Sequence, residues 1–138
     1  LAIGINNTKE LDDDQTEANQ IHIKTRILED IEAMVIMAKA KNINIAVATL
    51  TSTNRPQLDG FITRSKLVQT INLEIAQLCI KHDAQFIDYY TVMTETKEDI
   101  DYLRNELTDD GLHPHVLGYD RMADTLVNTL PYPIQLKN

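Results

Sequence analysis

The sequence Ile-Asn-Ile-Ala-Val-Ala-Thr-Leu, residues 43–50, is a nearly continuous apolar run in the middle of the chain. Its length and its β-branched content are typical of a strand that is covered on both faces. Apolar residues recur at three- and four-residue steps on both sides of it, in residues 16–41 and 64–82. This periodicity is typical of amphipathic helices. The sequence therefore predicts a buried strand between two helices.

Shorter predicted elements extend this pattern toward both ends of the chain. They are strands at residues 1–5 and 84–88, loops at 8–14 and 51–60, a long connection at 89–112 with one helical stretch near 100–107, and a final helix at 116–130. Pro131 and Pro133 are expected to end that helix. Strands that alternate with helices favour right-handed crossovers and a parallel sheet. Three strands are few for such a sheet, and ligands bind beyond the carboxyl ends of its strands.

The composition narrows the class of protein. The chain has 138 residues, which fits one domain over residues 1–138, and its formal net charge is -8. The acidic balance argues against nucleic acid as a partner, and no apolar run approaches the ~20 residues of a membrane helix. Cys79 is the single cysteine, so no internal disulfide forms. The chain opens on an apolar segment without a methionine, and we expect it to be the later part of a longer protein.

The stretch with the clearest chemistry covers residues 109–123. Within it, Asp110 and His113 lie three residues apart across a turn that contains Gly111. This spacing brings a carboxylate within reach of an imidazole nitrogen, which fixes the tautomer and stabilises the imidazolium of a general base. The pattern Asp-x-x-His alone is more often a surface turn, so its interpretation depends on the surrounding sequence.

Two longer patterns narrow that interpretation. Asp-Gly-Leu-His-Pro at residues 110–114, followed by Gly-Tyr at 118–119 and Met-Ala at 122–123, resembles the last sequence block of the SGNH hydrolases, also called the GDSL esterase/lipase family. Gly-Ile-Asn-Asn at residues 4–7 resembles the Gly-x-Asn-Asp block of the same family. By this resemblance, Asn6 donates to the oxyanion hole. Asn7 stands where the family usually has aspartate.

The resemblance implies a fold and a reaction. The fold is a three-layer, flavodoxin-like α/β fold with helices on both faces of a parallel sheet, and this chain would be its later portion, with the first two strands missing. The reaction is serine-dependent hydrolysis of a carboxylic ester, in which His113 takes the proton, Asp110 orients His113 and Asn6 helps to bind the oxyanion. The substrate is expected to be a small-molecule, lipid or sugar ester, and no metal or organic cofactor is implied.

The serine nucleophile of the family has no counterpart in the sequence. The family's Gly-Asp-Ser block and glycine block are both missing, so we expect the chain to be inactive alone. Ser65 is interpreted as a residue of a helix start, and Ser52 as a polar loop residue without the strained turn of a nucleophile elbow. Asn54 and Arg55, in the loop after the central strand, are candidates for the rim of the substrate site.

Two alternatives to an ester hydrolase stay open. One is a non-catalytic binding or scaffold protein that keeps the fold without the serine. The other is a phosphate- or nucleotide-binding flavodoxin-like module, for which residues 4–8 make a poor phosphate loop. In the sheet that the SGNH resemblance implies, the missing first strand would lie beside the strand at residues 1–5 and leave it as a bare edge. We therefore expect a homo-oligomer or an exchange of segments through that edge, or residual upstream peptide bound there.

Overall fold

The computed structural model describes residues 1–130, and the two prolines expected to end the last helix, Pro131 and Pro133, lie outside the described residues. Four α-helices and two 3-10 helices make up most of residues 1–130, with four short strands between them. The elements are η1 (Ile5–Asp12), α1 (Glu17–Ala40), β1 (Ala46–Ala48), α2 (Phe61–Lys81), β2 (Gln85–Ile87), α3 (Tyr89–Met93), β3 (Thr94–Lys97), β4 (Ile100–Leu103), η2 (Asn105–Leu107) and α4 (Val116–Thr129).

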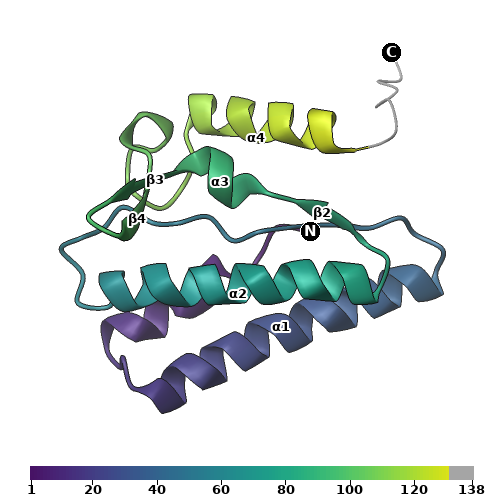
Figure 1. The fold of residues 1–138 in the computed structure, drawn as a ribbon, viewed down its shortest axis with the longest axis horizontal. Helices are drawn as coiled ribbons and strands as arrows, with labels where there is room; N and C mark the ends of the chain where they lie inside the picture. The colour runs from purple at the N-terminus through teal and green to yellow at the C-terminus, as the bar shows by residue number, and fades with distance from the viewer. Residues whose placement is uncertain (131–138) are drawn as a thin grey trace.

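A small parallel sheet lies at the centre of the molecule (Figure 1). β1 and β2 pair in parallel, with Val47 opposite Phe86. Leu1 lies along the other edge of β1, because its amino group donates to the carbonyl of Ala46 and its carbonyl accepts from Ala48. The parallel pairing confirms the α/β fold that the sequence predicts.

Helices cover both faces of this sheet. In Figure 1, α1 and α2 lie on one side of the strands and α4 lies on the other. The side chains of β1 alternate between these two layers, as a strand requires. Val47 packs into the core with α1 and α2, whereas Ala48 packs into a second core with α3 and η2, against which Met122 of α4 is placed.

The long predicted helices are confirmed. α1 begins after Thr16, whose hydroxyl accepts from the main-chain amide of Asn19 at 3.4 Å, and a hydroxyl is a favoured cap of a helix N-terminus. Its apolar stripe is buried at Ile23, Ile27 and Ile31. No helix within residues 1–130 is long and apolar enough to cross a membrane.

Two predictions on the local structure are wrong. Residues 100–103, expected in a helical stretch, form β4 and pair with β3 in an antiparallel hairpin. Glu98 and Asp99 both adopt positive φ angles, 50° and 63°, and two such residues make the tight turn that suits the twist of a hairpin. Residues 1–5 are not a strand beyond the bonds of Leu1, because Gly4 with φ 118° turns the chain into η1, which also replaces the predicted loop at 8–14.

A buried aspartate fastens the hairpin to the rest of the molecule. Asp101 of β4 accepts hydrogen bonds from the hydroxyls of Tyr90 and Thr96 and from the amide of Gln69 on α2. Burial, together with the neighbouring Asp101 carboxylate, raises the pKa of Tyr90 above its usual range. The phenol therefore stays protonated and acts as a donor, and these hydrogen bonds connect the hairpin to α2 and α3.

Candidate functional site

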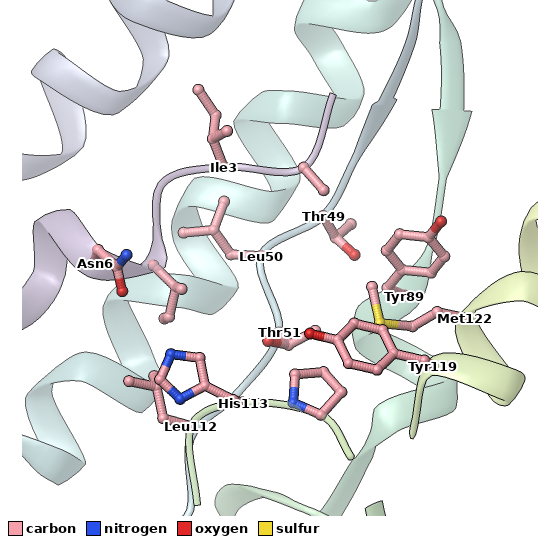
Figure 2. A pocket seen from close by; sticks show the side chains of 13 residues that line it. Ile3, Asn6, Thr49, Leu50, Thr51, Tyr89, Leu112, His113, Tyr119 and Met122 are labelled. Atoms are coloured by element: carbon pink, nitrogen blue, oxygen red, sulfur yellow. The ribbon is translucent and has the colours of Figure 1, made fainter. Parts of the chain in front are cut away.

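A pocket of about 320 Å³ opens beyond the carboxyl ends of β1 and β2, since Thr49, Thr51 and Tyr89 line it. This is the edge at which parallel sheets bind ligands. Figure 2 shows Asn6 and His113 along one side of the pocket and Tyr89, Tyr119 and Met122 on the other. The lining residues are Ala2, Ile3, Ile5, Asn6, Thr49, Leu50, Thr51, Tyr89, Leu112, His113, Pro114, Tyr119 and Met122.

His113 and Asp110 form a hydrogen-bonded pair at this pocket. Nδ1 of His113 lies 2.6 Å from Oδ2 of Asp110. The other carboxylate oxygen, Oδ1, accepts from the main-chain amides of His113 at 2.7 Å and of Leu112 at 2.8 Å. These bonds, from the amide and the imidazole of His113 and from the amide of Leu112, hold the pKa of Asp110 well below its usual range.

The ionised carboxylate of Asp110 sets the tautomer of the His113 imidazole. An ionised carboxylate only accepts hydrogen bonds, so Nδ1 of the neutral ring carries the proton and Nε2 carries the free lone pair. The imidazole is 68% exposed, and His113 lines the pocket. A carboxylate that holds an exposed imidazole in this tautomer is an arrangement that can act as a base with its orienting group.

The turn between Asp110 and His113 contains Gly111, whose backbone conformation only glycine adopts readily. Gly111 has φ 74°, and a Cβ atom there would lie 2.1 Å from the carbonyl oxygen of Asn54. Its amide donates to the hydroxyl of Thr108 at 3.0 Å, and that hydroxyl lies 2.7 Å from the carbonyl of His113, to which it donates. Both the positive φ and the close approach require glycine at this position.

Asn6 lines the pocket from the first turn of η1. Its segment is held by a buried residue that the sequence reasoning missed, Arg64 of α2. Arg64 donates through Nε to the hydroxyl of Thr8 at 3.0 Å and through Nη2 to its carbonyl at 3.1 Å and to Asp12 at 2.7 Å. Arg64 falls on the same helical stripe as Leu67, and a cation on an apolar stripe is the signal that could have found it.

The two predicted rim residues hold the His113 loop. The side-chain amide of Asn54 donates to the carbonyl of Leu103 at 2.8 Å and to Asn105 at 2.7 Å, and its main-chain amide donates to Gly111 at 2.7 Å. Arg55 contacts Asp110, and it also lines a second pocket of about 280 Å³. The two pockets share Ile5, Asn6 and Leu112.

Neither serine of the chain lines either of these two pockets. Ser52 is buried, with its hydroxyl 2.8 Å from that of Thr94. Ser65 is also buried, and its hydroxyl contacts the main chain of Asp101. Within residues 1–130, no group of three or more His, Cys, Asp or Glu side chains is arranged to hold a metal ion.

Four further pocket residues were not singled out from the sequence as site residues. Thr49 and Thr51 follow β1, and their position after a buried strand is the signal that could have found them. Tyr119 and Met122 lie three residues apart on α4, and this face of the helix forms part of the pocket wall. His115, near the predicted base, caps α4 by accepting from the amide of Leu117 at 3.2 Å.

Comparisons with known proteins bear on the family and the fold of this chain. The model of the GDSL-like lipase/acylhydrolase family matches residues 1–121. A search of curated proteins finds no significant match. Among solved structures, a putative acylhydrolase from Bacteroides fragilis is similar, with 24% identity, a TM-score of 0.67 and coverage of 76% of this chain and 50% of that one.

Two other solved structures share the fold. A GDSL-like lipase from Bacteroides thetaiotaomicron has 24% identity and a TM-score of 0.67, with coverage of 76% of this chain and 51% of that one. A mutant of an acetyl-xylooligosaccharide esterase from Geobacillus stearmophilus has 15% identity and a TM-score of 0.65, with coverage of 99% and 60%. The alignments span about half of the two Bacteroides structures.

Proposed function

The chain belongs to the GDSL-like lipase/acylhydrolase family, and we propose that it supplies the base and one oxyanion donor of a serine-dependent carboxylic ester hydrolase. The observation that carries the proposal is the His113–Asp110 contact of 2.6 Å at a pocket that Asn6 also lines. A base with its orienter and an amide donor at one pocket are three of the groups that acyl transfer needs.

Each of these groups has a step in the proposed reaction. Nε2 of His113 takes the proton of a serine hydroxyl while the serine oxygen attacks the ester carbonyl. The carbonyl oxygen becomes an oxyanion that the amide of Asn6 stabilises, and Asp110 stays ionised and stabilises the imidazolium. His113 then gives its proton to the leaving alcohol. His113 next takes a proton from water, whose oxygen attacks the acyl-serine, and returns that proton to the serine oxygen as the acid leaves.

We place the nucleophile outside residues 1–138. The two serines of the chain are both buried away from the pocket, whereas a nucleophile must lie within hydrogen-bond reach of its base. The proposal therefore treats residues 1–138 as the later portion of one domain, whose preceding portion carries the serine. The protein with that portion is called the nucleophile-bearing protein below.

We propose a short acyl group as the part of the substrate that enters the pocket. Its volume of about 320 Å³ lies at the lower end of the range for ligand pockets. Apolar side chains, among them Leu50 and Met122, line it next to His113. A similar structure is an acetyl-xylooligosaccharide esterase, which supports acetyl esters of sugars as the first substrates to test.

Labelling with a fluorophosphonate and hydrolysis of an activated acetyl ester test the proposal together. The nucleophile-bearing protein should be labelled and active, and the 138-residue chain should be neither. If the 138-residue chain hydrolyses the ester as fast as the nucleophile-bearing protein, and Ser52→Ala abolishes that activity, then Ser52 is the nucleophile. A nucleophile-bearing protein that binds esters but neither reacts nor hydrolyses them would instead support the non-catalytic binding or scaffold protein.

We also propose that the chain alone self-associates through its apolar N-terminal edge and α4. Ile3 beside β1 is 43% exposed, and Val116, Leu117 and Val127 of α4 are more exposed still. Contiguous exposed apolar side chains favour association, whether by edge pairing or by exchange of segments. Light scattering across a wide concentration range should show a dimer or larger species, and a monomer at every concentration would contradict this.

A further inference from the structure

Arg55 contacts Asp110 at two places. Its Nε donates to the main-chain carbonyl of Asp110 at 2.9 Å, and its Nη2 lies 3.4 Å from Oδ2 of the same residue. Oδ2 is the oxygen that is paired with Nδ1 of His113. One carboxylate oxygen is therefore held from two directions, by the imidazole and by a guanidinium that comes from the loop after β1.

The Arg55 side chain starts from a firmly held segment. The preceding Thr53 is buried, and its carbonyl accepts from the amide of Leu103 in β4. Asn54 bonds to Leu103 through its side chain and to Gly111 through its main chain. A guanidinium presented from such a segment makes a planar, two-pronged contact with its target. Arg55 thus links the end of the central strand to the exposed turn that carries Asp110.

We propose that Arg55 is a positioning residue that keeps the carboxylate of Asp110 on Nδ1 of His113. The inference rests on the proposed function only in taking the pair as a catalytic dyad. Without Arg55, Oδ1 keeps the two main-chain amides of its own turn. The carbonyl of Asp110 and Oδ2, by contrast, lose their contact with the strand-end segment, and Oδ2 becomes free to turn away from the imidazole.

The proposed effect of Arg55 on the position of the Asp110 carboxylate depends on geometry more than on charge. The side chains of Arg55 and Asp110 are 31% and 43% exposed, and exposed ion pairs contribute little by electrostatics alone. The bond from Nε to the main-chain carbonyl does not depend on the charge of the carboxylate. A small misplacement of an orienting group lowers the rate of a reaction strongly, because the reacting atoms leave their aligned position.

A second cation–carboxylate–imidazole arrangement supplies a matched control. Lys81 and His82 both contact Oε1 of Glu32, at 2.7 Å and 2.6 Å. Removing the cation there should change the surroundings of His82 and leave those of His113 as they are. The variant Lys81→Gln therefore repeats the removal of one positive charge at a place away from the pocket.

Nitrogen NMR of the imidazoles in the 138-residue chain is the first test. In the unsubstituted chain, neutral His113 should carry its proton on Nδ1, with a downfield Nδ1–H resonance. Arg55→Gln should lower the ratio of the Nδ1–H to the Nε2–H tautomer by about threefold, as the loss of one modest hydrogen bond does. Arg55→Lys, which reaches one of the two acceptors, should fall between, and Lys81→Gln should leave His113 unchanged.

The spectra decide the proposal without any measurement of activity. A His113 tautomer that is unchanged in a folded Arg55→Gln chain would overturn it, and so would an equal change in Lys81→Gln. Failure of the proposed function would appear separately, as a nucleophile-bearing protein that hydrolyses no ester.

Kinetics of the nucleophile-bearing protein separate positioning from contact with the substrate, the role expected for a rim residue. Positioning predicts that Arg55→Gln lowers kcat about tenfold with KM nearly unchanged, because the ground-state complex keeps its contacts. A raised KM at an unchanged kcat would overturn the proposal and assign Arg55 to substrate binding at the second pocket.

Discussion

Within residues 1–130, two histidine–carboxylate pairs have the same length, and of these two only the His113–Asp110 pair lies at the pocket beyond the carboxyl ends of the strands. His113 lies 2.6 Å from Asp110, and His82 lies 2.6 Å from Glu32. A cation also contacts the carboxylate in each case, Arg55 in the first and Lys81 in the second. Contact distance and composition therefore do not distinguish a catalytic dyad from a surface ion pair.

The surroundings distinguish the two pairs. The Asp110 carboxylate is bound by two amides of its own turn, and the imidazole, bonded through Nδ1, is 68% exposed at the pocket that Asn6 lines. His82 is bonded through Nε2 and is only 19% exposed, and its partner Glu32 comes from the neighbouring helix α1. In the His113–Asp110 pair, Nε2 is the ring nitrogen that does not contact the carboxylate, and the ring lines the pocket. The His82–Glu32 pair instead connects the end of α2 to α1.

Replacing the carboxylate of each pair by its amide should give the largest difference in kcat between the two pairs. In the nucleophile-bearing protein, Asp110→Asn should lower kcat by about four orders of magnitude, because an amide that donates to Nδ1 stabilises the wrong tautomer. Glu32→Gln should leave kcat within about twofold. Steady-state kinetics on an activated acetyl ester measure both, and equal losses in the two variants would contradict the assignment.

Removing the amide side chain beside each pair gives the next largest effect. Asn6→Ala should lower kcat by about 10²- to 10³-fold with little change in KM, because the oxyanion exists only along the reaction. Gln77, which lines a groove with Glu32 and Lys81, supplies the control, and Gln77→Ala should retain full activity. A loss that appears only in KM would show that Asn6 binds the ground state of the substrate.

A glycine substitution tests whether the turn around the pocket pair needs its unusual backbone. Gly111→Ala forces a side chain into φ 74° and onto the carbonyl of Asn54, which should lower the free energy of unfolding by about 1–3 kcal/mol. Asp83→Ala is the control, because Asp83 already carries a side chain at φ 49° next to His82. Denaturant unfolding measures both, and equal stability of the two variants would show that the turn adapts.

Acid titration should give the smallest effect, a loss of the stability that the Asp110 carboxylate contributes as the pH falls. The main-chain amides and the imidazole of His113 depress the pKa of Asp110 in the folded state. Its stabilising contribution is therefore fully present above the unfolded pKa of about 3.9 and is lost as the pH falls toward the folded pKa. The stability difference between the chain and Asp110→Asn should shrink below about pH 4, and carboxyl carbon NMR should find Asp110 ionised there. A difference that is constant with pH would contradict this.

Most of the fold follows from local patterns in the sequence. The apolar stripes of residues 16–41 and 64–82 predict α1 and α2, because burial of one face fixes a long helix. The hairpin was missed because its turn, Glu98-Asp99, contains no glycine or asparagine, the residues that usually mark such turns. A hairpin strand of four residues, such as β4, carries too short a pattern to be told from a helix.

The site was predictable where its residues are neighbours in the sequence. The spacing of Asp110 and His113 predicts the contact that the structure contains. The contacts of Arg55 with Asp110 and of Arg64 with Thr8 span 55 and 56 residues, and single side chains that meet only after folding leave no local pattern. The catalytic roles of Asn6, Asp110 and His113 remain predictions that the kinetic comparisons address.

Chemical rescue of the base tests the central claim most directly. In the nucleophile-bearing protein, His113→Ala should lower ester hydrolysis by about four orders of magnitude, and added imidazole should restore part of the rate by taking the proton of the serine. His82→Ala should hydrolyse the ester at the wild-type rate and gain nothing from imidazole. A His113→Ala protein that keeps its full rate, or a loss in His82→Ala that imidazole restores, would contradict the claim that His113 is the base.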